Sequence, residues 1–126
     1  MDTNSVLPQY QGSNEVMTGF NARVTAKQRE YLPIIQQAMN CPSEGTALNL
    51  LTQAEAVAVR QHDRQQHDYL PTTEPKPFTI SYKYSKADRQ ALEYLQSFYN
   101  APSRGDVICH LLNQAIAILE SGKDGE

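Results

Sequence analysis

Two stretches of the chain alternate apolar and polar residues with a period of two. In the first, Phe20, Ala22 and Val24 are separated by polar side chains. In the second, the apolar positions are Phe78, Ile80, Tyr82 and Tyr84. A period of two with one polar face is typical of a half-buried strand. The pattern therefore predicts two short strands, each with one face on a core and one face in solvent.

A helix-start signal follows each strand at once. Gln28 comes three residues after Thr25, and Asp88 three residues after Ser85, which is the spacing of a capping box. Apolar residues then recur at helical spacing in both segments: Leu32, Ile35 and Met39, then Leu92, Leu95 and Tyr99. We predict a helix in each segment. Pro33 removes a hydrogen bond from the first, at a cost of about 3 kcal/mol, so that helix is either kinked or differently bounded.

Each of these helices is expected to end at an asparagine and to be followed by a second helix. Asn40 and Asn100 belong to a residue type that tolerates the left-handed conformation of a helix end. Ser43 and Ser103, each placed after a proline, suit the N-cap of a further helix. Apolar residues at helical spacing follow: Ala47, Leu48, Leu51 and Ala58, then Val107, Ile108, Leu111, Ala115 and Ile118. The unit is therefore a strand, a helix, a turn and a helix.

The two units are copies of each other. A shift of sixty positions places residues 20–59 on residues 80–119 without a gap, and eight of the forty pairs are identical. A unit this small cannot bury its own apolar faces, and a lone strand leaves an unpaired edge. We therefore expect a mainly α-helical fold with a small antiparallel β-ribbon. In it, the two copies form an intramolecular pseudo-dimer, with the strands paired and four helices interlocked behind them.

The charge distribution divides the chain in the same way. Each repeat carries a net charge of +1, whereas the acidic excess lies in the two ends and in the connector. Three prolines in the connector favour an extended linker. We expect a flexible N-terminal arm, a first repeat, a linker, a second repeat and a C-terminal tail at residues 1–18, 19–61, 62–77, 78–119 and 120–126.

Composition excludes several classes of protein. At 126 residues the chain has room for one compact domain or two very small motifs. A net charge of −3 argues against a histone-like protein that binds polyanions by charge alone. Two cysteines exclude a disulfide framework and a zinc ribbon. No apolar run approaches the roughly 20 residues of a membrane span, and no signal pattern is present, so we expect a cytoplasmic protein without a membrane partner.

The repeated unit resembles the ribbon-helix-helix family of DNA-binding proteins, in its Arc-like and methionine-repressor-like form. Phe-Asn-Ala-Arg-Val-Thr, residues 20–25, is similar to the Phe-Asn-Leu-Arg-Trp-Pro ribbon of Arc-type members. The Pro-Ser-x-Gly stretches at residues 42–45 and 102–105 match the small polar start of the family's second helix. The resemblance covers about 80 of the 126 residues. The tandem arrangement is similar to that of relaxosome accessory proteins, in which one chain supplies both halves.

The resemblance implies that a two-stranded ribbon reads double-stranded DNA in the major groove, with no cofactor. By position, the residues that contact bases are Asn21, Arg23, Thr79, Ser81 and Lys83. The family also binds phosphates at the start of its second helices, which here means Ser43, Glu44, Gly45, Ser103, Arg104 and Gly105. Arg104 favours an anion at that position, whereas Glu44 opposes it. We therefore expect an asymmetric target, with the stronger backbone contacts in the second half.

Two classes of function follow. The first is a transcriptional repressor or regulator, or a plasmid or phage accessory protein, which self-associates on adjacent DNA sites. The second is a protein-binding module of the same fold, antitoxin-like or an inhibitor, with a protein as its partner. Catalysis is not expected, because the chain has no phosphate-cradling glycine loop, no His-Glu-x-x-His and no nucleophile elbow.

Several other residues invite a functional interpretation. His62 and His67 are five positions apart, which does not place two imidazoles on one helical face, so a metal site is not expected. Gly45 and Gly105 either allow a phosphate to approach or ease helix packing. The remaining candidates are expected to be structural or inert: Tyr82, Tyr84, His110, Cys41 and Cys109.

Overall fold

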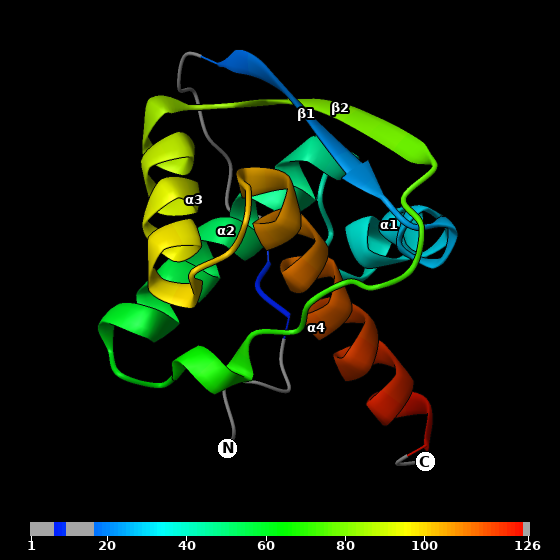
Figure 1. Cartoon of the computed structure of the whole chain (residues 1–126). Coiled ribbons are helices and arrows are strands. Elements are labelled where there is room, and N and C mark those ends of the chain that lie inside the picture. Colours follow the sequence, from blue (N-terminus) through cyan, green and yellow to red (C-terminus); the bar gives the residue numbers. More distant parts are fainter. Residues whose placement is uncertain (1–6, 10–16, 125–126) are drawn as a thin grey trace.

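The computed structural model describes residues 7–9 and 17–124 (Figure 1). In chain order its elements are β1 (Thr18–Val24), α1 (Ala26–Ala38), α2 (Glu44–Arg60), the short 3₁₀ helix η2 (Gln66–Asp68), β2 (Phe78–Tyr84), α3 (Lys86–Tyr99) and α4 (Arg104–Asp124). The predicted class, mainly α-helical with a small antiparallel ribbon, is confirmed at this level.

The two strands pair antiparallel and cross one end of the helices (Figure 1). At the middle of the ribbon Asn21 pairs with Ser81, and these residues are sixty positions apart. β1 and β2 also begin sixty positions apart, and so do α1 and α3, and α2 and α4. The period found in the sequence is therefore also the period of the secondary structure.

The inner face of the ribbon and the facing sides of the helices form one core. The inward strand residues are buried, except for the half-buried Phe20 and the exposed Thr18 and Phe78; the buried ones are Ala22, Val24, Ile80, Tyr82 and Tyr84. The expectation that the two tyrosines pack in the core is therefore confirmed. The largest apolar side chains with at most 1% exposure come from the four helices and the end of α1: Leu32, Ile35, Met39, Leu48, Leu92, Leu95, Ile108, Leu111 and Leu112.

Tyr82 carries a buried hydroxyl that has no hydrogen-bond partner among the described residues. We expect Tyr82→Phe to raise the free energy of unfolding by about 1 kcal/mol, because it removes an unsatisfied polar group from the core. Tyr84→Phe is the matched control and is expected to lower it by about 1 kcal/mol. The Tyr84 hydroxyl accepts a hydrogen bond from Arg104 Nη1 at 2.7 Å, and that bond would be lost. Urea denaturation of both variants measures the difference; a destabilised Tyr82→Phe protein would contradict the prediction.

The local signals at the helix ends are confirmed. Both predicted capping boxes are present, with each side chain accepting from the other residue's backbone N–H: Thr25 with Gln28, and Ser85 with Asp88. The two asparagines at the ends of the first helices adopt left-handed φ values, 56° at Asn40 and 55° at Asn100. These short motifs set where each helix begins and ends.

α1 does not end at Pro33 but continues through it to Ala38. The proline is exposed. The carbonyl that loses its helical N–H donor is that of Arg29, which is also an exposed residue, so water can satisfy it. The sequence pattern could not decide between a kink and a different boundary; the structure keeps one helix across this position.

Most residues of the linker are exposed and without regular structure, as its prolines suggested, but the linker also packs on the helices. It includes η2, and its Tyr69 ring stacks on the Tyr99 ring with centroids 5.7 Å apart. The backbone N–H of Leu70 donates to Nδ1 of His110 at 2.9 Å. The physical reason is that His110 is fully buried on α4 and takes its polar partner from the linker. The expectation that His110 is structural is thereby confirmed.

Described parts of both predicted end segments also pack on the helices. α4 runs to Asp124, well into the predicted tail. It does so because Glu120 is bonded to α1, by the Tyr31 hydroxyl at 3.2 Å and by an ion pair with Lys27 at 3.2 Å. Within the predicted flexible arm, Leu7 is only 8% exposed and belongs to the core. The other residues of that arm, except those at 8–9 and 17–18, lie outside the described part of the chain.

Candidate nucleic-acid interface

The outer face of the ribbon consists of three cross-strand pairs of exposed residues: Gly19 with Lys83, Asn21 with Ser81, and Arg23 with Thr79. Because alternate side chains of a strand point to opposite faces, these residues lie on the side away from the helices. All five residues predicted to contact bases are therefore on one exposed face. The sixth, Gly19, has no side chain and leaves the face open beside Lys83.

The two cations of this face have different surroundings. Arg23 donates from both Nε and Nη2 to the carbonyl oxygen of Lys76, at 3.1 and 2.8 Å. The ammonium group of Lys83 makes no hydrogen bond or ion pair with any residue that the structure describes. One end of the ribbon thus presents a fixed guanidinium and the other a free ammonium. In the sequence Lys76 is only one residue of the linker, and no pattern there points to this contact.

α2 and α4 are each tied to one strand of the ribbon near their first turns. The amide of Asn49 on α2 donates to the carbonyl of Lys83 at 2.8 Å. The thiol of Cys109 on α4 donates to the carbonyl of Arg23 at 3.3 Å. Positions 49 and 109 are sixty apart, and both side chains make the same kind of contact. Only this matched spacing could have pointed to them, because the two residue types differ.

The start of α4 gathers several charges. Ser103 accepts a hydrogen bond from the Asp106 N–H at 3.2 Å, and Lys76 Nζ forms an ion pair with Asp106 Oδ1 at 2.5 Å. This contact raises the pKa of Lys76. Partial burial opposes ionisation of Asp106, but the bonds from Lys76 and Ser103 outweigh it and lower its pKa. A cavity of about 620 Å³ opens here, and its lining includes both basic and acidic residues: Arg23, Lys76, Arg104, Glu74 and Asp106.

The two turns predicted to bind phosphate differ in charge, as the sequence indicated. The Arg104 guanidinium lies 4.9 Å from the centre of the Phe20 ring and donates to the Tyr84 hydroxyl. Glu44, at the matching position of α2, forms an ion pair with Arg29 at 3.7 Å. The α4 end therefore offers a positive side chain, whereas the α2 end offers a neutralised pair.

The two glycines of these turns have different environments. A Cβ atom on Gly45 would lie 2.8 Å from the Cβ of Tyr82, closer than packed atoms allow. A Cβ on Gly105 would find its nearest neighbour, Ser103 Oγ, at 3.6 Å. At Gly45 the helix-packing explanation therefore holds. At Gly105 packing gives no reason for a glycine.

We expect Gly45→Ala, but not Gly105→Ala, to destabilise the protein. Gly45→Ala should lower the free energy of unfolding by about 1–3 kcal/mol, because the added methyl group overpacks the contact with Tyr82. Gly105→Ala should leave it unchanged or raise it by up to about 0.5 kcal/mol, because alanine is the better helix former. Each variant is the control for the other, since both change the second residue of a helix. Equal midpoints of thermal unfolding would contradict the prediction.

A buried polar cluster lies between α2, α3, α4 and the linker, and the sequence did not reveal it. Glu55 is 4% exposed and accepts hydrogen bonds from Arg64 Nε at 3.1 and 3.2 Å and from Gln114 Nε2 at 3.1 Å. It also accepts from the Tyr99 hydroxyl. His110 Nε2 lies 3.4 Å from the same carboxylate. Since His110 Nδ1 accepts from the backbone, its Nε2 carries the proton that faces Glu55.

This cluster holds Glu55 in its charged form. Burial alone would raise the pKa of Glu55, but the hydrogen bonds from His110 and Tyr99 and the charge of Arg64 outweigh it and lower that pKa. Arg64 belongs to the linker, so the carboxylate fastens the linker to the helices. The matching position of the second repeat is Ala115, so the second repeat has no carboxylate equivalent to that of Glu55.

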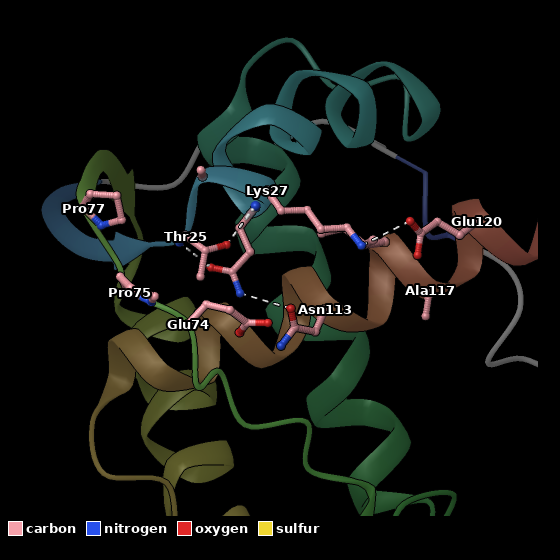
Figure 2. A pocket seen from close by; sticks show the side chains of 11 residues that line it. Thr25, Lys27, Glu74, Pro75, Pro77, Asn113, Ala117 and Glu120 are labelled. Carbon is pink, nitrogen blue, oxygen red and sulfur yellow. Dashed lines mark hydrogen bonds and ion pairs between the residues drawn. The ribbon is translucent and has the colours of Figure 1, made fainter.

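A second cavity, of about 500 Å³, lies between the start of α1, the linker and α4 (Figure 2). Gln28 is buried beside it, and its amide donates to Asn113 Oδ1 at 3.0 Å. The ion pair of Lys27 with Glu120 spans one side (Figure 2). Pro75 and a second linker proline line the wall. The hydrogen bond and the ion pair join α1 to α4, and the last part of the linker passes beside them immediately before β2.

Neither the thiols nor the linker histidines lie on the outer face of the ribbon. Cys41 and Cys109 are buried and free, and burial raises the pKa of both thiols. His62 and His67 are exposed. Among residues 7–9 and 17–124, no three His, Cys, Asp or Glu side chains come together as metal ligands could.

Within the same residues, no helix has the length and apolar character needed to cross a bilayer. Comparison of the chain with protein-family models, with curated proteins and with solved structures gives no match.

Proposed function

We propose that this protein binds specific sequences of double-stranded DNA through its β-ribbon. The main support for the proposal is the set of polar side chains on the outer face of the ribbon. An antiparallel pair of strands exposes Asn21, Arg23, Thr79, Ser81 and Lys83 side by side, opposite the face that packs on the helices. A two-stranded ribbon fits the major groove, where each base pair presents a distinct pattern of donors and acceptors. These five side chains supply hydrogen-bond groups suited to that pattern.

The same proposal includes an intramolecular pseudo-dimer of two ribbon-helix-helix repeats. Its support is the sixty-residue offset of every repeated strand and helix and the pairing of Asn21 with Ser81, which are equivalent residues. A ribbon centred on equivalent residues has an approximate two-fold axis at its middle. Such an axis matches the two-fold axis of a DNA site composed of two half-sites.

The side chains favour an imperfect rather than an exact palindrome. Arg and Lys donate to guanine, Asn forms a bidentate pair with adenine, and Ser and Thr bond to several bases. One half presents Asn21 and Arg23, and the other presents Ser81 and Lys83. The turn before α4 carries Arg104 and the turn before α2 carries Glu44, so backbone contacts should be stronger in the half that contains α4.

In the cell we propose a role as a transcriptional regulator or as a plasmid or phage accessory protein. With a net charge of −3, the protein should have little affinity for DNA of arbitrary sequence. A single ribbon reads a short site. We therefore propose that several copies bind adjacent sites together.

Selection of bound duplexes from a random DNA pool at two salt concentrations tests the proposal. We expect a short, imperfectly two-fold motif to be enriched at both concentrations. Salt-labile retention without a motif would mean that only the DNA backbone is bound. No enrichment by folded protein would favour the alternative, a protein-binding module of the same fold.

Glu44→Gln gives a prediction about affinity alone. It removes a negative charge beside the start of α2 and releases Arg29, so we expect affinity for the selected duplex to rise several-fold. The preferred sequence should not change, because the residue faces the backbone rather than the bases. Glu93→Gln, on the exposed face of α3, removes the same charge elsewhere and is the control. Weaker binding by the Glu44→Gln protein would contradict the proposed phosphate contact.

A further inference from the structure

We propose that the linker positions Arg23 and thereby concentrates base specificity in one half of the DNA site. The inference rests on the proposed DNA binding and deepens it. It begins from the two hydrogen bonds by which Arg23 Nε and Nη2 share the carbonyl oxygen of Lys76, 53 residues away. Lys83, at the matching position of β2, has no such partner among the described residues.

The carbonyl of Lys76 is itself firmly held. Lys76 lies between Pro75 and Pro77 in the sequence, and proline fixes its own φ and restricts the preceding residue to extended conformations. The side chain of Lys76 is anchored at the same time, because its ammonium pairs with Asp106 Oδ1 in the first turn of α4. The Asp106 carboxylate in turn accepts from the Ser103 hydroxyl at 2.6 Å. The carbonyl oxygen that accepts from Arg23 is therefore held by the two neighbouring prolines and by the ion pair between Lys76 and α4.

The bonds to Lys76 leave the reading edge of Arg23 open. A guanidinium has five N–H groups, and the linker carbonyl takes one from Nε and one from Nη2. Both N–H groups of Nη1 and the second of Nη2 remain. One N–H of Nη1 and the remaining N–H of Nη2 form the end-on edge, which can donate to O6 and N7 of guanine. The contact thus orients Arg23 without using the donors that base recognition needs.

Holding a side chain in place before binding also lowers the entropy lost on binding. Immobilising one long side chain weakens binding by roughly two- to ten-fold, so a prepositioned Arg23 gains a factor of that size for its preferred base. Lys83 presents a compact charge on a flexible stem with three rotatable donors, which tolerates several acceptors. We therefore expect a strong base preference in the half of the DNA site that Arg23 contacts. We expect a weak base preference in the half that Lys83 contacts.

Three variants separate the effect of positioning Arg23 from the effect of changing the net charge at the interface. Lys76→Gln breaks the ion pair with Asp106 and removes a positive charge from the interface. Asp106→Asn breaks the same ion pair but removes a negative charge, and its amide oxygen can still accept from Ser103. Lys76→Arg keeps the ion pair. Electrostatics alone predicts weaker overall binding for Lys76→Gln and tighter overall binding for Asp106→Asn.

The experiment is selection of duplexes by each variant, read at the base pair whose preference disappears in Arg23→Ala. We expect Lys76→Gln and Asp106→Asn both to lose roughly two- to ten-fold of that preference, despite their opposite effects on overall affinity, and Lys76→Arg to retain it. Unchanged preference in both variants overturns the inference while DNA binding stands. If wild-type protein enriches no motif, the proposed function fails and the inference fails with it.

A measurement on the free protein tests the positioning of Arg23 independently of DNA binding. Hydrogen exchange at Nε–H of Arg23, followed by NMR, should be slower in wild-type protein and in Lys76→Arg than in Lys76→Gln. Equal rates in wild type and Lys76→Gln would overturn the positioning role, whatever the DNA data show. Unfolding midpoints of the three variants, measured alongside, identify any loss of preference that comes from loss of fold.

Discussion

Glu55→Ala is expected to destabilise the protein by about 3–5 kcal/mol, the usual cost of removing one partner of a buried charged pair. The carboxylate is 4% exposed and accepts bonds from Arg64, Gln114 and the Tyr99 hydroxyl. Truncation leaves these buried and half-buried donors without their shared acceptor. It also releases the linker, which Arg64 fastens to α2. Since domains of this size are stable by roughly 5–15 kcal/mol, such a loss is a large part of the total.

The control for this prediction is Glu93→Ala. Glu93 forms an exposed ion pair with Arg89 one helical turn away, at 3.4 Å. Pairs of this kind contribute about 0.3–0.5 kcal/mol, so the control should unfold almost as wild type does. Urea denaturation compares the two variants. A loss below about 1 kcal/mol for Glu55→Ala would contradict a stabilising role for the cluster.

The lowered pKa of Glu55 also gives the sign of a pH effect. A carboxyl group with a depressed pKa in the folded state contributes stability that is fully present above its ordinary value of 4.5. That contribution is lost as the pH falls through the lower, folded-state pKa. Wild-type protein should therefore lose stability below pH 4.5 more steeply than Glu55→Gln does. Identical pH profiles for the two proteins would show that Glu55 does not carry this dependence.

The repeated elements were predictable because their signals are local. Capping boxes such as Thr25 with Gln28 act over three residues, and strand alternation assigns a face to each residue without any tertiary information. The linker and the chain ends were not predictable in this way. Tyr69 stacks on Tyr99, thirty residues later, and Glu120 is bonded to Tyr31, 89 residues earlier. Such contacts depend on how the helices pack, which periodicity does not encode.

The candidate interface likewise has a part that local signals predict and a part that they do not. Alternation was sufficient to place Asn21, Arg23 and their counterparts on one exposed face. It could not reveal that Lys76 bonds to Arg23, because that contact depends on the path by which the linker enters β2. Nor could it reveal the role of Glu55. A glutamate on an apolar helix looks like a solvated residue until His110, from a distant helix, is seen beside it.

Replacing Asn21, Arg23, Ser81 and Lys83 together with alanine should abolish specific DNA binding, with a loss on the order of 10³-fold or more. Each good bidentate contact to a base is worth about 1–3 kcal/mol, and the four side chains include at least two that can make one. The fold should survive, because all four side chains are exposed. Binding of the selected duplex, measured by fluorescence anisotropy at fixed salt, gives the loss.

The comparison of Arg23→Ala with Arg60→Ala separates the loss of base recognition from the loss of one positive charge. Arg60 is exposed in the last turn of α2, at the end away from the ribbon, where its guanidinium lies 5.0 Å from the centre of the Tyr94 ring. Both variants remove one positive charge, but only Arg23→Ala should lose the preference for one base.

The fourfold variant also distinguishes the two classes of function. A DNA-binding protein loses its target with these residues, whereas a protein-binding module that uses another surface keeps its partner. Retained DNA specificity in the fourfold variant would mean that the ribbon does not read the bases.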